Sequence, residues 1–179
     1  MNYIFSAIFL YFFLGFLLYI FQRRIVFNKS GHPGAPKDYK LDNTEEVYIK
    51  TEDNLKLLSW YHKGNNSLPL LVYFHGNSFH IGDRAYRIQR YIEKNWSVLL
   101  VSWRGFGGNK GNPTEKNLYK DAEAVLKWIK NNTEFKFKEL VIYGESLGSG
   151  AAVEIGTKYE FLSIVLEAKM NYKIRNFGL

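Results

Sequence analysis

The 179-residue sequence predicts an α/β fold, with a mostly parallel β-sheet covered by helices on both faces and one transmembrane helix in front of it. Three observations support this prediction. Continuous apolar runs, typical of strands buried on both faces, alternate with segments of helical periodicity. One of these runs ends at a glycine-rich turn that opens a helix of small residues. The N-terminal segment is uncharged and long enough to cross a bilayer.

The composition excludes several classes of protein. The chain has no cysteine, so a disulfide framework, a thiolate nucleophile and a cysteine-based zinc site are excluded. The net charge of +7 comes from lysines and arginines scattered singly among acids rather than gathered in one patch. We therefore expect no nucleic-acid partner, and the sequence indicates no cofactor and no metal.

Residues 1–22 are expected to form a membrane anchor. From Tyr3 to Phe21 there are 19 residues without a charge, which as a helix match the thickness of a bilayer core. The alternative is a cleaved signal peptide, but the positive charges follow the apolar run and no small-residue cleavage site is present. Arg23, Arg24 and Lys29 favour a cytoplasmic location for the domain that follows.

A truncated soluble domain is expected over residues 46–179, joined to the anchor by a linker over residues 23–45 that is rich in glycine and proline. Its first element is a β-hairpin around the turn Asp53-Asn54, with strands at 46–51 and 55–62. Buried parallel strands are expected at residues 68–74, 96–102, 140–143 and 162–166. Helices are expected at residues 83–94, 114–130 and 149–153, whereas residues 169–179 have no convincing period.

The segment Gly144-Glu145-Ser146-Leu147-Gly148 has the pattern of a nucleophile elbow. A serine hydroxyl is a poor nucleophile unless it is held exposed, near a base and near donors for the developing oxyanion. Here the pattern lies where a strand must end and a helix must begin, and its two glycines leave room for a strained turn. This context favours Ser146 as a catalytic nucleophile over a purely structural glycine-rich turn.

The oxyanion hole is expected to use the backbone N–H of Leu147 and a second N–H from the loop His75-Gly76-Asn77-Ser78. In that loop Gly76 allows a tight backbone path, and Asn77 or Ser78 is the donating residue. A histidine at the end of a buried strand more often fixes a loop by hydrogen bonding than acts as a base. We therefore expect structural roles for His75 and His80.

Three segments resemble the membrane-anchored α/β hydrolases of the Bem46 type, grouped with the serine aminopeptidase-like hydrolases: FHGN, SWRGFGGNKGNPTEKNLYKDAEAVLKWI and VIYGESLGSGAAVEIG. The resemblance covers about residues 22–168 and implies an α/β-hydrolase fold. It also implies hydrolysis of an ester, thioester or amide in an acyl-type small molecule or a peptide, through an acyl-Ser146 intermediate. Taken alone, Gly105 to Gly111 indicates only a flexible loop, and a phosphate-binding loop is rejected because no Gly-Lys-Ser/Thr ending follows.

In this fold the catalytic acid and histidine follow the serine in chain order. No histidine follows Ser146, and the acids Glu154, Glu160 and Glu167 fall on a predicted helix and strand. Because the resemblance ends at Ala168, we expect a C-terminally truncated domain with impaired activity. Two alternatives remain open: a non-catalytic, membrane-tethered binding module, and one half of a split hydrolase. The sequence does not indicate an oligomeric state.

Overall fold

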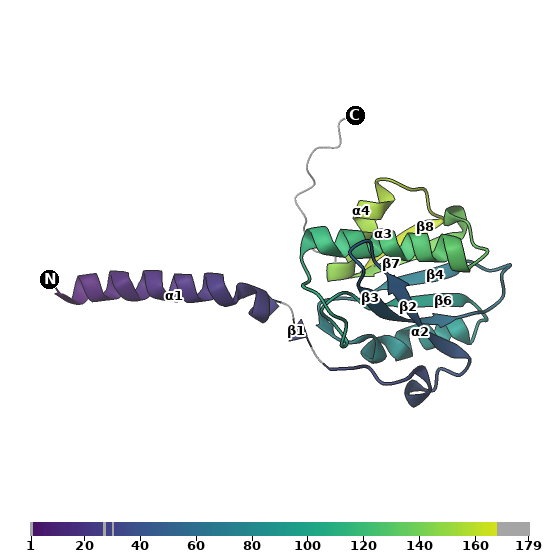
Figure 1. Ribbon diagram of the computed structural model, residues 1–179, viewed down its shortest axis with the longest axis horizontal. Helices are drawn as coiled ribbons and strands as arrows, with labels where there is room; N and C mark the ends of the chain where they lie inside the picture. Colours follow the sequence, from purple (N-terminus) through teal and green to yellow (C-terminus); the bar gives the residue numbers. More distant parts are fainter. Residues whose placement is uncertain (1, 27, 30, 168–179) are drawn as a thin grey trace.

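A computed structural model describes residues 2–26, 28–29 and 31–167 of the protein, and the expectation for residues 169–179 lies outside them. Its domain has a six-stranded sheet with the strand order β2-β3-β6-β4-β7-β8. Helices α3 and α4 cover one face, and α2 covers the other (Figure 1). The predicted α/β fold with helices on both faces of a mostly parallel sheet is confirmed.

Helix α1 (Asn2–Val26) extends away from the domain in Figure 1. Within it, Tyr3–Gln22 is apolar and long enough to cross a membrane, and none of its length is buried against the protein. Nearly all its described side chains are exposed, many of them phenylalanine, leucine, isoleucine or tyrosine. Such a surface is unfavourable in water and favourable in hydrocarbon.

The first two strands of the sheet, β2 (Thr44–Lys50) and β3 (Lys56–His62), form the expected antiparallel hairpin. Asn54 adopts a left-handed conformation in the turn, with φ of 62°. The Thr51 hydroxyl donates to the Asp53 carboxylate at 2.7 Å and stabilises the turn. Strand β3 also pairs antiparallel with β6 and so joins the hairpin to the rest of the sheet.

The other four strands are parallel: β6 (Ser97–Val101), β4 (Leu70–Phe74), β7 (Leu140–Glu145) and β8 (Ser163–Glu167). Every residue of β4 and β6 is buried. This explains why these strands have continuous apolar runs rather than an alternating pattern. Strand β8 forms one edge of the described sheet, and its Ile164 and Val165 are 38% and 39% exposed.

The helices lie close to their expected positions, at α2 (Ala85–Ile92), α3 (Glu115–Asn132) and α4 (Leu147–Gly156). Short 3-10 helices form at Pro36–Tyr39, Ile81–Arg84 and Phe137–Glu139. Helix α3 begins after Thr114, whose hydroxyl accepts a hydrogen bond from the Asn117 N–H at 3.2 Å. Two short strands that periodicity did not predict, β1 (Asn28–Lys29) and β5 (Ser78–Phe79), pair in parallel outside the main sheet.

A buried ion-pair network fixes the loop after β6 to its surroundings. Arg104 is 2% exposed and binds Asp121 of α3 through Nε and Nη2, at 2.8 and 2.6 Å. Asp121 is fully buried and also accepts the Arg104 backbone N–H. At the hairpin turn, Asp53 accepts both terminal guanidinium nitrogens, at 2.8 and 3.1 Å. The hydrogen bonds from Arg104 lower the pKa of Asp53 to about 2.

The two carboxylates of this network provide a matched pair of substitutions. Asp121→Asn should lower the free energy of unfolding by about 3–5 kcal/mol, because it leaves a buried guanidinium incompletely paired. Asp53 is 44% exposed, so Asp53→Asn should cost about 1 kcal/mol or less. Urea unfolding followed by tryptophan fluorescence measures both. Equal costs for the two variants would contradict the assignment of Asp121 as the buried partner.

Candidate active site

Ser146 lies between the end of β7 and the start of α4, in a strained conformation. Its φ of 46° and ψ of −108° are sparsely populated by residues other than glycine. The turn is fixed on both sides, since the Ser146 N–H donates to the Glu167 carbonyl at 2.8 Å and its own carbonyl accepts the Ser149 N–H at 2.9 Å. This is the strand–turn–helix geometry that a nucleophile elbow requires.

The two glycines of the elbow are needed for close backbone approach. A Cβ added at Gly148 would lie 2.1 Å from the Phe74 carbonyl oxygen, and one at Gly144 would lie 2.7 Å from the Ser149 Cα. Both obstacles are backbone atoms, which cannot move aside without displacing a helix or a strand. Helix α4 can therefore pack against the ends of β4 and β7 only because these two positions lack side chains.

The loop that follows β4 comes directly to the elbow. A Cβ added at Gly76 would lie 3.3 Å from the Ser146 Cβ and 3.0 Å from a carboxylate oxygen of Glu145. Asn77 follows Gly76, and the backbone of Ser78 enters β5. Leu147 is the first residue of α4, where backbone N–H groups are not used by the helix itself. The fold thus brings together the segments that carry Ser146, Leu147, Asn77 and Ser78, and their catalytic roles stay predictions.

His75 is fully buried and fixes this loop. Its Nδ1 donates to the Gly76 carbonyl at 2.7 Å, and its Nε2 accepts the Trp103 backbone N–H at 3.5 Å. The Trp103 indole N–H donates to the His75 carbonyl at 2.8 Å. Burial, followed by the charge of Arg84, lowers the pKa of His75 to about 4, so the ring is neutral at pH 7. Both ring nitrogens are occupied, which agrees with a structural role. His80, also expected to be structural, begins the 3-10 helix over residues 81–84.

Two ion pairs that the sequence did not predict lie at the ends of β7 and β8. In the first, Glu145 accepts from Arg84 at 2.8 and 3.1 Å and from the Tyr73 hydroxyl at 2.9 Å. Burial raises the pKa of Glu145, but the hydrogen bonds and charge of Arg84 outweigh it and hold the pKa below its usual value. Glu145 is therefore a carboxylate held by Arg84 next to the loop at Gly76.

The second pair repeats the arrangement one strand further out. Glu167 accepts from Arg87 at 2.6 Å and from the Tyr143 hydroxyl at 2.6 Å. Tyr73 and Tyr143 stack with their ring centroids 4.7 Å apart, so the two pairs form one cluster under α2. The spacing of Arg84 and Arg87 by three residues is the one sequence signal that could have indicated it, since it places both on one helical face.

The glycine loop from Gly105 to Gly111 is held by hydrogen bonds. Asn109 lies at its centre: its side-chain oxygen accepts the Leu58 N–H at 2.8 Å, and its amide donates to the Ser102 and Trp103 carbonyls. The loop wraps around this side chain, with φ values of 78° and 102° at its two end glycines. Composition indicates flexibility here, but the contact of Asn109 with Leu58 joins residues 51 positions apart and leaves no local signal.

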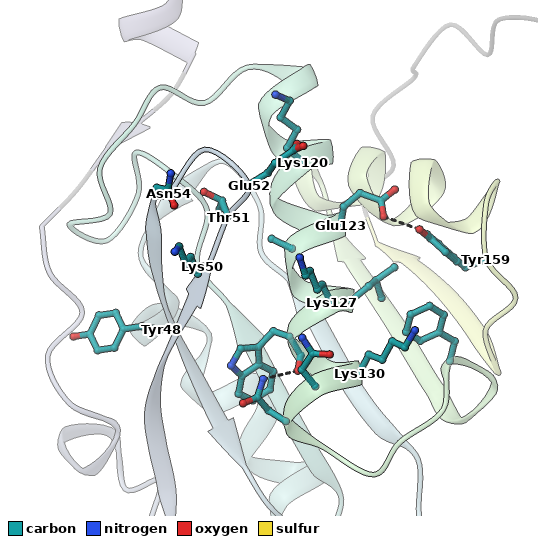
Figure 2. Close-up of a pocket in the computed structure, with 16 residues that line it drawn as sticks. Tyr48, Lys50, Thr51, Glu52, Asn54, Lys120, Glu123, Lys127, Lys130 and Tyr159 are labelled. Carbon is teal, nitrogen blue, oxygen red and sulfur yellow. Dashed lines mark hydrogen bonds between the residues drawn. The ribbon is translucent and has the colours of Figure 1, made fainter.

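A surface groove lies away from the elbow, between the β2–β3 hairpin and α3 (Figure 2). It has a volume of about 950 Å³ and contains Lys120, Lys127 and Lys130 of α3 and Lys50 of the hairpin. None of the four predicted site residues lines it. Within the described residues, no group of three or more histidine, aspartate or glutamate side chains is placed to hold a metal ion.

The parallel sheet, the strained serine between β7 and α4, and the adjoining loop after β4 together define an α/β hydrolase. Residues 66–170 match the family described as serine aminopeptidase, S33, and the chain belongs to that family. It is similar to protein bem46 of Schizosaccharomyces pombe, with 30% identity over 156 residues, 81% of this chain and 51% of that protein.

Two further proteins extend the comparison. An uncharacterized membrane protein of Saccharomyces cerevisiae is 30% identical over 158 residues, 84% of this chain and 55% of that protein. A structure of the Pyrococcus furiosus esterase Pf2001 is 29% identical, with a TM-score of 0.58 over 70% of this chain and 51% of that one. The chain spans about half the length of the curated relatives it matches.

The buried histidine predicts a pH dependence of stability. An unfolded histidine takes up a proton near pH 6.5, whereas folded His75 does so only near pH 4. Its contribution should therefore be fully present above pH 6.5 and fall by about 3 kcal/mol as the pH drops to 4. His75→Gln should remove this slope. Urea unfolding of both proteins between pH 7 and 4 measures it, and parallel curves would contradict the buried, neutral state.

Proposed function

We propose that Ser146 is the nucleophile of a serine hydrolase that cleaves an ester, thioester or amide bond of an acyl-type small molecule or a peptide. The observation that carries this proposal is the contact between the Gly76 loop and the strained Ser146 turn. Strain at a nucleophile is useful because it holds the hydroxyl clear of the helix. The candidate oxyanion donors Asn77 and Ser78, which follow Gly76 in the same loop, also support the proposal.

In the proposed reaction, Ser146 Oγ attacks the substrate carbonyl carbon while a general base takes its proton. The N–H groups of Leu147 and of Asn77 or Ser78 stabilise the tetrahedral oxyanion. Collapse releases the alcohol, thiol or amine and leaves an acyl-serine ester, which water then hydrolyses with the same base. The neutral donors and the N-terminal end of α4 favour the negative charge that develops.

In this proposal, a segment of polypeptide beyond β8 supplies the general base. All four histidines of the sequence precede Ser146, and both ring nitrogens of His75 are occupied. Strand β8 offers an exposed edge on which a further strand can pair. We therefore propose that residues 1–179 alone are impaired, and that a following or separate segment supplies the acid and histidine. The second candidate, a non-catalytic binding module, is favoured by the same missing base.

A fluorophosphonate probe separates these candidates. The 179-residue chain should react at Ser146, on the order of 10³-fold or more slower than Pf2001 esterase, because no histidine follows Ser146 in the sequence. Ser146→Ala should abolish labelling, and Ser163→Ala, an exposed serine of β8, should not. Mass spectrometry of the labelled peptide measures site and rate.

Two outcomes would contradict the proposed reaction or its dependence on a missing base. A folded chain that never labels at Ser146 would favour the binding module. Labelling as fast as that of Pf2001 esterase would show that the chain already contains a functioning base.

We also propose that α1 anchors the protein in a membrane, with the domain on the cytoplasmic side. The exposed apolar surface of Tyr3–Gln22 and the likeness to a membrane protein of Saccharomyces cerevisiae support the anchor. The arginines directly after the apolar stretch support the orientation.

The absence of cysteine allows a direct test of this orientation. Gly31 is exposed and has open space around it, so Gly31→Cys should introduce a single reactive thiol without disturbing the fold. In intact bacterial cells, a membrane-impermeant maleimide should fail to label it, and permeabilised cells should show full labelling. Equal labelling in intact cells would place the domain outside, and recovery in the soluble fraction would contradict the anchor.

A further inference from the structure

The segment between α1 and the sheet touches the loop that follows β4 and also the glycine loop from Gly105 to Gly111. We call residues 28–29 and 31–39 the strap. Its first part, β1, pairs in parallel with β5, with Asn28 opposite Ser78 and Lys29 opposite Phe79. Strand β5 begins directly after Asn77, a predicted oxyanion residue. The strap therefore adds a short strand to the loop that supplies the oxyanion donors.

The rest of the strap packs on neighbouring loops. Pro33 approaches the glycine loop, since a Cβ added at Gly107 would lie 3.6 Å from its Cδ. The Tyr39 hydroxyl donates to the Pro33 carbonyl at 2.6 Å, and its ring packs on buried Trp60. At Gly82 an added Cβ would lie 2.4 Å from the Tyr39 ring. These contacts hold the strap against the domain independently of β1.

The loop that carries Asn77 and Ser78, called the oxyanion loop below, needs support from a neighbouring segment such as β1. Phe79 has a φ of 61°, a left-handed conformation that is strained for an aromatic residue, and its side chain is 51% exposed. A strained backbone persists only where the surrounding structure holds it. Among the described strands, β5 has β1 as its pairing partner and does not belong to the main sheet.

We propose that β1 is a positioning element of the active site: by pairing with Ser78–Phe79 it holds the backbone of Asn77 and Ser78 at Ser146. The segment that directly follows α1 thereby sets the geometry of the oxyanion loop. The catalytic consequence rests on the proposed hydrolase function, whereas the support of the loop does not.

The test uses the full 179-residue chain in lipid vesicles. A double variant, Asn28→Pro with Lys29→Pro, removes both backbone N–H groups of β1, and Asn28→Ala with Lys29→Ala is the matched control that keeps them. Hydrogen–deuterium exchange of residues 76–80 should be at least 10-fold faster in the proline variant. The alanine variant should match the wild type, and residues 70–74 of β4 should keep their protection in both.

A second readout concerns the chemistry. The maximal rate of fluorophosphonate labelling at Ser146 should fall at least 10-fold in the proline variant, with an unchanged probe concentration at half-maximal rate. Unchanged exchange of residues 76–80 overturns the proposal, and so does faster exchange with an unchanged labelling rate. If the wild-type chain does not label at all, the proposed function fails, and the exchange experiment still decides whether β1 supports the loop.

Discussion

The site depends on the close approach of α4 to the end of β4, where Gly148 meets the Phe74 carbonyl. Phe74 is the last residue of β4, and the loop of Gly76 and Asn77 starts one residue later. Because α4 begins at Leu147, the same contact fixes the first turn of the helix beside that loop. A side chain at position 148 would push the helix away from the strand and separate Ser146 from the loop of Gly76 and Asn77.

Charged side chains reinforce this arrangement on the side of the sheet that α2 covers. Beneath α2, Arg84 and Arg87 bind carboxylates at the ends of β7 and β8, and the stacked Tyr73 and Tyr143 join the two pairs. Burial raises the pKa of Tyr143 to about 12, so its hydroxyl stays a hydrogen-bond donor. The Arg84–Glu145 pair is sensitive to the loss of one member, because the remaining charge is left largely buried without that partner. The two pairs specify geometry more than they add stability.

The parts of the fold that could be predicted are those with a local signal. Strands β4 and β6 were predictable because burial on both faces requires continuous apolar residues, and the elbow because its glycines occupy fixed positions around Ser146. The partner of Arg84 lies 61 residues away, and that of Arg87 lies 80 residues away, so no periodicity links them. Strands of two residues, such as β1 and β5, are too short to have a period.

The strap limits how far Ser146 can lie from the apolar stretch of α1. Val26, the last residue of α1, lies four positions after Gln22, and β1 begins two positions after Val26. The distance between Gln22 and Ser146 has an upper limit of about 30 Å. This limit adds the rise per residue of a helix, the rise per residue of an extended chain and the spacing between two paired strands. In the proposed transmembrane arrangement, Ser146 therefore stays within about one domain diameter of the bilayer.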